Sequence, residues 1–426
     1  MPVKTVKTTC IAVLCGLLFC ATGAVSASAA TPCPVADVAQ DLVSPNPQIR
    51  LKAGRVLRQA ACFGAALPLA TLIADPVDEV QLEGIAGEVA IFLNKNAVPK
   101  RRVGFLIEVR HEVASDAFWA GPMTSTGRPA PPQVLAALRT AAHDDNPRVA
   151  VEALYAFGAL ASEVKGTARQ ELQAANGPYL ADLAGSSQME MRLAAVAVIG
   201  RLYARWPGEN LEESVGPAMV TALGDVNDAV KVVAARGIGG MRYERALQPL
   251  TDLFTARGKG DVAEAAADAL ARIAHPSSMP LFTSLITSPE APLRAIAIAG
   301  LARGGDRRAL ADIVDNLAFE RSDEVLLSVN FAWIMLENTT IDPLGEGLLK
   351  ASGHDLALAY LIEVATLRPA KFLAYAIDPD PRLRADVADI LGVTRDPRGL
   401  PLVQPMLKDK NPLVVQAAER AIARMQ

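Results

Sequence analysis

The sequence has few aromatic residues and few of the side chains that build reactive or metal-binding sites. Only 5% of the 426 residues are aromatic, and the chain contains four histidines and five cysteines. No histidine belongs to a His-Glu-x-x-His motif, and no two histidines lie at the spacing of metal ligands. Gly-x-Ser-x-Gly, P-loop and dinucleotide-binding fingerprints are also absent. We therefore expect no catalytic residue, no metal and no cofactor, and a protein that is not an enzyme.

The chain also lacks an excess of positive charge. Its formal net charge is −4 and its pI is about 5.7. Proteins that bind nucleic acid by neutralising phosphates usually carry a basic patch. The densest basic cluster, Lys100-Arg101-Arg102, is interpreted as a solvated helix end. We expect no nucleic-acid partner.

Long apolar runs are missing everywhere except at the N-terminus. Lys4 and Lys7 precede the uncharged, mostly apolar stretch Ile11–Val25, and small residues follow up to Ala30. This order is typical of a secretory signal peptide, with cleavage after Ala29 or Ala30. A transmembrane anchor is the alternative, but it needs about twenty apolar residues. We predict that residues 1–30 direct export to the periplasm or the extracellular space, and that the mature chain has no transmembrane segment.

After cleavage only two cysteines remain, Cys33 and Cys62. An isolated pair in an oxidising compartment is most simply a disulfide, and closing this loop would stabilise the chain by about 3 kcal/mol. The bond would attach the first helix to the first repeat, at an end of the chain that has no neighbouring repeat. Two free buried thiols are the alternative.

What the sequence does contain is a repeated pattern, clearest in Asp228–Gly239. An apolar residue opens each copy, a small residue usually follows four positions later, and a large apolar residue usually follows eight positions later. Positions i, i+4 and i+8 share one face of a helix. The copies recur about every 31 to 42 residues, which is typical of a helical solenoid. The opening residues are Ile49, Val80, Val149, Met191, Val230, Val262, Leu293, Val325, Leu383 and Val414.

A second helix-forming segment, often opened by proline, precedes each copy, and a short Asp- or Asn-containing turn joins the two. We therefore predict an all-α fold, an α-solenoid of about 10–12 helix–turn–helix repeats over residues 31–426. Two wider gaps predict degenerate repeats near Val103–Ala117 and His354–Val364. Glycines that follow the large residue, at Gly158, Gly200 and Gly239, are expected to end helices.

The pattern Asp-x-x-Val-Arg-x-x-Ala-x-x-Ala-Leu-Gly resembles HEAT repeats, particularly the short bacterial type also found in phycobilin lyases. The resemblance covers roughly residues 35 to 426. It implies that a basic residue early in the second helix pairs with a turn acid of an adjacent repeat. Residues that match this position are Arg50, Arg192, Lys231, Arg294 and Arg384. Residues that depart from it are Ala150, Ala263, Leu326 and Val415.

Residues 114–132 break the repeat pattern with Phe118-Trp119, a Gly-Pro pair and several prolines. This composition predicts a loop insertion that is much longer than the repeat turns. The two aromatic side chains either tuck into the degenerate repeat or form an exposed hook, and we favour tucking.

Two short motifs invite a catalytic or metal-binding interpretation. His143-Asp-Asp145 lies in a repeat turn, where acids serve as helix caps. Ser162-Glu-Val-Lys165 matches the Ser-x-x-Lys of penicillin-interacting enzymes, but the companion Ser-Asp-Asn and Lys-Thr-Gly motifs are absent. We assign no chemistry to either.

The remaining candidate is the surface formed by successive second helices, which in such arrays usually lines the concave face and binds another chain. Side chains six positions after the opening residue mix both charges and include two aromatics, as protein interfaces do. They are Arg55, Tyr155, Arg236, Asp268, Phe331, Asp389 and Arg420. Burial of Tyr155 and Phe331 in the core is the alternative.

The sequence thus predicts an exported, non-catalytic scaffold that presents a helical surface to a protein or peptide partner. Two other functions stay open. One is a ligand- or chromophore-handling enzyme of phycobilin-lyase-like type, and the other is a structural element of the cell envelope.

Overall fold

The computed structural model describes residues 32–92, 101–103, 106–108, 114–121, 123, 125–204, 215–316 and 320–426. The predicted signal peptide, residues 1–30, lies outside the described residues. Within those residues, no helix combines the length and the apolar character needed to cross a bilayer.

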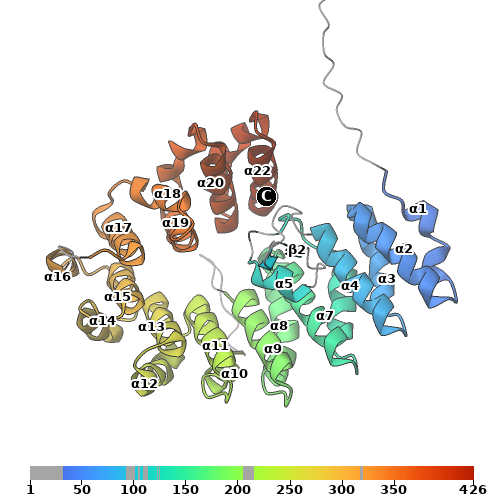
Figure 1. The fold of residues 1–426 in the computed structure, drawn as a ribbon, viewed down its shortest axis with the longest axis horizontal. Coiled ribbons are helices and arrows are strands. Elements are labelled where there is room, and N and C mark those ends of the chain that lie inside the picture. Colours follow the sequence, from blue (N-terminus) through green and yellow to red (C-terminus); the bar gives the residue numbers. More distant parts are fainter. Residues whose placement is uncertain are drawn as a thin grey trace, which may run out of the picture. The chain divides into compact units, whose positions relative to one another are not determined.

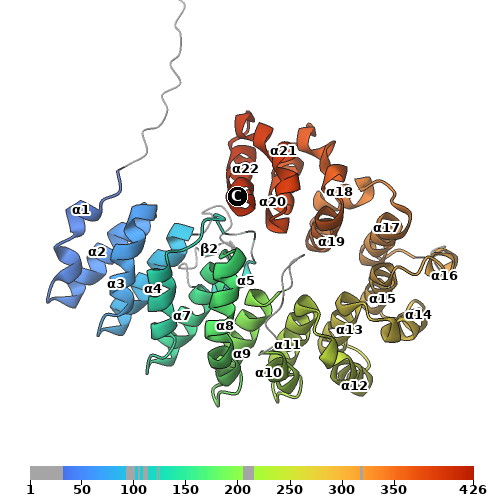
Figure 2. The ribbon, with the colours of Figure 1, turned by 180° about the vertical axis from the view of Figure 1, so that it is seen from behind.

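Pairs of antiparallel helices follow one another along the chain (Figures 1 and 2). The second helices pack side by side as one layer. They are α2 (Pro47–Ala60), α4 (Asp78–Phe92), α7 (Pro147–Ala161), α9 (Met189–Leu202), α11 (Asp228–Met241), α13 (Asp261–Ile273), α15 (Ala291–Gly304), α17 (Asp323–Glu337), α19 (His354–Leu367), α20 (Pro381–Thr394) and α22 (Pro412–Met425). The prediction of an α-solenoid of helix pairs is confirmed.

The first helices form the other layer and, apart from the 18-residue α8, are shorter. They are α1 (Val35–Val38), α3 (Ala66–Ile73), α6 (Pro132–Ala141), α8 (Gly166–Leu183), α10 (Gly216–Ala222), α12 (Leu247–Arg257), α14 (Met279–Leu285), α16 (Ala309–Asn316), α18 (Asp342–Leu348) and α21 (Leu400–Val403). Short 3₁₀ helices precede or replace several of them, most extensively in the last two repeats. There they are η8 (Pro369–Phe372), η9 (Tyr375–Ile377), η10 (Pro397–Gly399) and η11 (Gln404–Lys408).

The repeated apolar positions form the core between the layers. In α11 the side chains of Val230, Ala234 and Ile238 are completely buried. Burying one large aliphatic side chain contributes about 1.5–3 kcal/mol, so a row repeated in each helix pair holds the array together. Turn residues start the helices as predicted: Asn46 and Asn227 each accept a hydrogen bond from the backbone N–H two residues later. Proline then follows Asn46 at the first helical position, where no N–H donor is needed.

The prediction that Gly158, Gly200 and Gly239 end their helices is wrong, because all three lie inside α7, α9 and α11. They allow neighbouring helices to approach closely. A Cβ on Gly200 would lie 2.9 Å from the Cα of Gly237, and one on Gly239 would lie 2.8 Å from the Cα of Ala269. Several second helices end instead at a non-glycine residue with positive φ, such as Arg242 and Arg395.

A ladder of arginine–acid pairs joins successive turns, as the HEAT resemblance implies. Each arginine binds an acid of the next turn and also donates to the backbone carbonyl six residues before it. Ion-pair distances are 2.5 Å for Arg50–Asp75, 2.6 Å for Arg192–Asp225, 2.8 Å for Arg294–Glu320 and 2.7 Å for Arg384–Asp409. Lys231 departs from this arrangement and pairs with Asp228 of its own helix at 2.8 Å.

The first of the two wide gaps differs from the prediction. Instead of a helix pair near Val103–Ala117, β1 (Arg101–Val103) pairs antiparallel with β2 (Leu106–Glu108), and the short helix α5 (Ala114–Trp119) follows. The predicted loop therefore begins after Trp119 rather than at residue 114. The carboxylate of Glu152 accepts hydrogen bonds from the Ala114 and Ser115 N–H groups at 2.6 and 3.3 Å, which fixes the start of α5. The second gap does contain a helix pair, α18 and α19.

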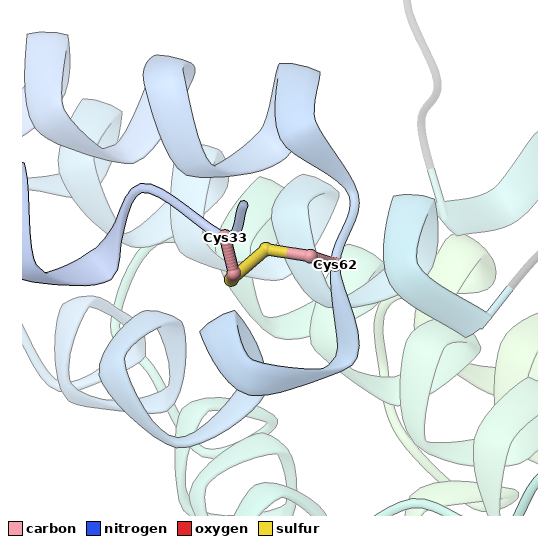
Figure 3. Close-up of a disulfide and its surroundings, with 2 residues drawn as sticks. All are labelled: Cys33 and Cys62. Atoms are coloured by element: carbon pink, nitrogen blue, oxygen red, sulfur yellow. A yellow bond between two sulfur atoms is a disulfide. The ribbon is translucent and has the colours of Figure 1, made fainter. Parts of the chain in front are cut away.

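Cys33 and Cys62 form the predicted disulfide, with their Cα atoms 5.8 Å apart (Figure 3). Cys33 lies just before α1, and Cys62 lies just after α2. The bond therefore ties the start of the described chain to the end of the first long helix.

Candidate partner-binding surfaces

The seven side chains predicted to face a partner have very different surroundings. Among the candidates that form ion pairs, Arg55 has the most exposed side chain, at 59%, and its guanidinium lies 3.8 Å from the Glu83 carboxylate. Arg236 is also exposed and has no hydrogen bond or ion pair to the described part of the chain. Tyr155 and Phe331 are 4% and 0% exposed, so the prediction that they contact a partner is wrong.

Phe331 is buried because neighbouring second helices use it to pack. Its ring stacks on Tyr360 of α19 with 4.3 Å between the centroids, and the Arg303 guanidinium lies over it at 5.3 Å. Arg303 also pairs with Glu363 at 2.7 Å, which joins α15 to α19 across α17. The neighbouring Trp333 lies eight positions after the opening residue Val325, where the repeat pattern predicts a core residue, but it is 37% exposed.

The three acidic and basic candidates in the later repeats are paired within the molecule. Arg420 of α22 binds Asp389 of α20 at 2.6 Å, and both side chains are 13% exposed. Asp268 binds Arg272, one turn further along α13, at 2.7 Å. Whether these residues also contact a partner stays a prediction, but a partner would have to compete with these ion pairs.

An aromatic cluster connects α5 to α7. The ring centroids of Phe118 and Tyr155 are 5.2 Å apart, and those of Trp119 and Tyr155 are 6.0 Å apart. Phe118 is buried, whereas Trp119 is 50% exposed. The favoured prediction, that both rings tuck into the fold, therefore holds for Phe118 and not for Trp119. Burial raises the pKa of Tyr155 to about 12, which keeps its hydroxyl protonated at neutral pH. Arg201 donates to the Phe118 carbonyl oxygen at 3.0 Å and lies over its ring.

A groove of about 600 Å³ opens between α2, α4, α5 and α7. Three guanidinium groups and three carboxylates line it, those of Arg55, Arg58, Arg148, Glu79, Glu83 and Glu152. Arg58 and Glu83 pair at 2.7 Å, and Glu152 caps α5. Exposed charges therefore remain at Arg55, Arg148 and Glu79. Sequence reasoning identified only Arg55, because the other residues come from three elements whose approach no sequence spacing reveals.

The last helix pair contacts a segment more than two hundred residues earlier in the chain. Lys165 Nζ donates to the carbonyl oxygens of Ala423 and Arg424 at 2.8 and 3.0 Å, at the end of α22. Arg395 donates to the carbonyl oxygens of Ser162 and Val164. Repeats of a solenoid ordinarily contact only their neighbours, so this closure contact is an addition to the repeat plan.

A buried carboxylate lies at the centre of the closure contact. Glu163 is 2% exposed and lies 3.5 Å from the Arg424 guanidinium and 3.7 Å from that of Arg395. Burial alone would raise the pKa of Glu163, but the charges of Arg424 and Arg395 outweigh burial and hold it below its usual value. Glu163 is therefore ionised at neutral pH.

The Ser162-x-x-Lys165 motif has no catalytic arrangement. Ser162 Oγ donates to the Ala159 carbonyl oxygen at 2.7 Å, while Lys165 is engaged with α22. Across the described ranges, no group of three or more His, Cys, Asp and Glu side chains is placed to hold a metal ion.

No known protein family and no curated protein matches the sequence. Solved structures align with it at low identity. An engineered protein is 17% identical, with a TM-score of 0.44 over 92% of this chain and 98% of that chain. A designed armadillo repeat protein is 21% identical, with a TM-score of 0.38 over 64% of this chain and 99% of that one. Importin beta is 14% identical, with a TM-score of 0.37 over 92% of this chain and 50% of its own length.

At these values the fold assignment rests on the chain's own geometry. The helix pairs share one packing register, and the arginine–acid ladder repeats along them. The described chain is a HEAT- or armadillo-like helical-repeat protein.

Proposed function

We propose that this protein is an exported, non-catalytic scaffold that binds a protein or peptide partner in the groove between α2, α4, α5 and α7. The observation that carries the proposal is the set of exposed charges on this groove, Arg55, Arg148 and Glu79, beside side chains that are already paired. A partner that brings a carboxylate to Arg55 and Arg148 competes there only with the long 3.8 Å contact from Arg55 to Glu83, whose charge is already paired with Arg58 at 2.7 Å.

The exposed aromatic ring of Trp119 extends this surface along α5. Tryptophan and arginine are the residue types that most often dominate binding energy at protein interfaces. Arg236 on α11 is a further exposed cation of the second-helix layer. Export is supported by the n-region, apolar stretch and small-residue site of residues 1–30, together with a disulfide that suits an oxidising compartment.

Site-specific photo-crosslinking in the native envelope tests the proposal. A photoreactive amino acid replaces Arg55, Arg148 or Arg236 in the exported protein, and Lys259 serves as a matched exposed control on the loop before α13. We expect the same crosslinked partner from Arg55 and Arg148 and none from Lys259. Equal crosslinking at all positions, or crosslinking at Lys259 alone, would refute the placement of the binding face. A coloured or small ligand that stays bound through purification would favour the ligand-handling alternative instead.

A further inference from the structure

Two adjoining hollows lie on the first-helix layer of the last two repeats, away from the groove described above. The larger, of about 730 Å³, includes Leu367 and Pro369, and the smaller, of about 380 Å³, includes Leu373 and Ile377. Both hollows are lined by Pro401 and Leu402, so they form one continuous apolar surface, called here the C-terminal hollows.

The C-terminal hollows exist because no long first helix covers this part of the array. Prolines begin the short elements η8 and η10, and Pro401 and Pro405 are the second residues of α21 and η11. Proline interrupts a helix because it lacks an N–H donor and clashes with the preceding turn. Apolar side chains stay in contact with solvent as a result: Leu367 is 55% exposed, Leu373 60% and Ile377 78%. A contiguous apolar patch on a monomer often marks a binding site.

The rim of the C-terminal hollows is positively charged. Lys371 Nζ donates to the carbonyl oxygens of Asn338 and Thr339 at 3.1 and 2.7 Å, and Arg368 donates to the carbonyl oxygens of Ile334 and Met335. These neutral oxygens fix the position of the two cations without cancelling their charge.

The other charges of the rim do not reverse this sign. Lys408 is exposed and adds a further cation. The acid that lines the hollows, Asp409, is bound by Arg384 at 2.7 Å, and Arg398 is neutralised by Asp396. Arg368, Lys371 and Lys408 therefore leave a net positive rim around an apolar floor.

We propose that the C-terminal hollows bind an acidic amphipathic segment of a partner protein. Its apolar side chains fill the two hollows on either side of Pro401 and Leu402, and its carboxylates meet the ammonium and guanidinium groups of the rim. Complementary charge favours an acidic segment over a basic one, because like charges across an interface cost several kcal/mol. This surface is separate from the groove at α2–α7 and can be tested independently of it.

The test uses the mature protein with its disulfide intact and a fluorescent synthetic peptide. Leucines at helical i, i+3, i+4 and i+7 spacing form one face of the peptide, and glutamates occupy the other. The matched control peptide carries lysine at every glutamate position. We expect the acidic peptide to bind at least about tenfold more tightly than the lysine peptide, with affinity that falls as salt rises.

Two variants locate the binding. Leu373→Ser with Ile377→Ser removes the exposed apolar floor, and Lys408→Glu reverses one rim charge, so each is expected to weaken the acidic peptide about tenfold. The control variants make comparable changes elsewhere: Val226→Ser removes an aliphatic side chain that is 93% exposed, and Lys259→Glu reverses an exposed charge. All five substituted positions are exposed, so circular dichroism and melting temperature of each variant should match the wild type.

Three results would overturn the proposal. One is equal binding of the acidic and lysine peptides. Another is equal weakening by the control variants. The third concerns the Leu373→Ser/Ile377→Ser variant. Its peptide binding would be unchanged, but it would have lost binding to phosphatidylglycerol–phosphatidylcholine vesicles or self-association in sedimentation. That result would assign the surface to a membrane or to a second copy.

Discussion

Replacing Glu163 by glutamine should release the last helix pair from the closure contact. Glutamine keeps the size of the side chain but removes the negative charge that faces Arg424 and Arg395. Removing one partner of a buried ion pair costs about 3–5 kcal/mol, because the remaining charge stays buried. Arg424 is itself only 2% exposed. It keeps a hydrogen bond to the Ser125 carbonyl oxygen at 3.1 Å and has Asp389 at 4.0 Å, so we expect the lower end, about 3 kcal/mol.

Native-state hydrogen exchange is the appropriate assay, because a long repeat array need not unfold in one cooperative step. A loss of about 3 kcal/mol raises the local opening constant of α22 roughly a hundredfold. The exchange of α11 amides, several repeats away, should not change. Glu190→Gln removes an exposed carboxylate from α9 and serves as the control. Unchanged protection of α22 in the Glu163→Gln variant would refute the assignment of the closure contact to this carboxylate.

The same variant makes a pH prediction whose sign follows from the lowered pKa of Glu163. A carboxyl group with a folded-state pKa below its usual value of 4.5 contributes its full stability above pH 4.5. That contribution is lost as pH falls through the folded-state pKa. Wild type and Glu163→Gln should therefore differ most at neutral pH and converge under acidic conditions. A difference that grows as the pH falls below 4.5 would contradict the reasoning.

Three further perturbations have expected outcomes. Glu88 is completely buried, its oxygens have no hydrogen-bond partner among the described residues, and burial raises its pKa to about 9. The free-energy cost of keeping the Glu88 carboxyl protonated in the folded protein is thus absent below pH 4.5 and grows as pH rises toward 9. Glu88→Gln should therefore stabilise the protein by about 3 kcal/mol at pH 7 and hardly at all at pH 4, as measured by melting temperature. Cys62→Ser should lower the free energy of local opening of α2, measured by hydrogen exchange, by about 3 kcal/mol. Mass mapping that finds Cys33 and Cys62 free in the native protein would contradict the disulfide on which this prediction depends. Gly200→Ala should destabilise by about 1–3 kcal/mol because its Cβ meets backbone, whereas Gly240→Ala, whose Cβ would meet only an atom at 4.0 Å, should stabilise by up to about 1 kcal/mol.

The repeat architecture could be predicted from sequence because its determinants are local. Val230, Ala234 and Ile238 share a helix face through their spacing alone, and the Arg192–Asp225 pair follows from the resemblance to HEAT repeats. The role of Gly200 could not be predicted, since helix-ending and close-packing glycines look alike until the neighbouring helix is placed. The hairpin of β1 and β2 was missed because the gap was interpreted through the period of the repeats around it.

The candidate surface was predicted less well for a related reason. A position six residues after the opening apolar residue faces the same side of every second helix, but its exposure depends on the side chains of the next helix. Where that helix offers an aromatic ring or an opposite charge, the side chain at this position packs or pairs within the molecule, as Phe331 does with Tyr360 and Asp389 with Arg420. These contacts need three-dimensional neighbours and leave no pattern in one chain.

Ion pairs and ring contacts between second helices are concentrated in the later repeats, and this affects where a partner can bind. From α15 onward the layer is joined by Arg303–Glu363, by the Phe331–Tyr360 stack and by Asp389–Arg420, and α22 is held against Lys165. A partner on that part of the layer would replace formed ion pairs and gain little net energy, because desolvating paired charges is costly. The exposed candidates lie on α2, α5, α7 and α11 instead. The later repeats expose their apolar surface on the opposite, first-helix layer. The two proposed binding surfaces therefore lie on different layers and in different parts of the array.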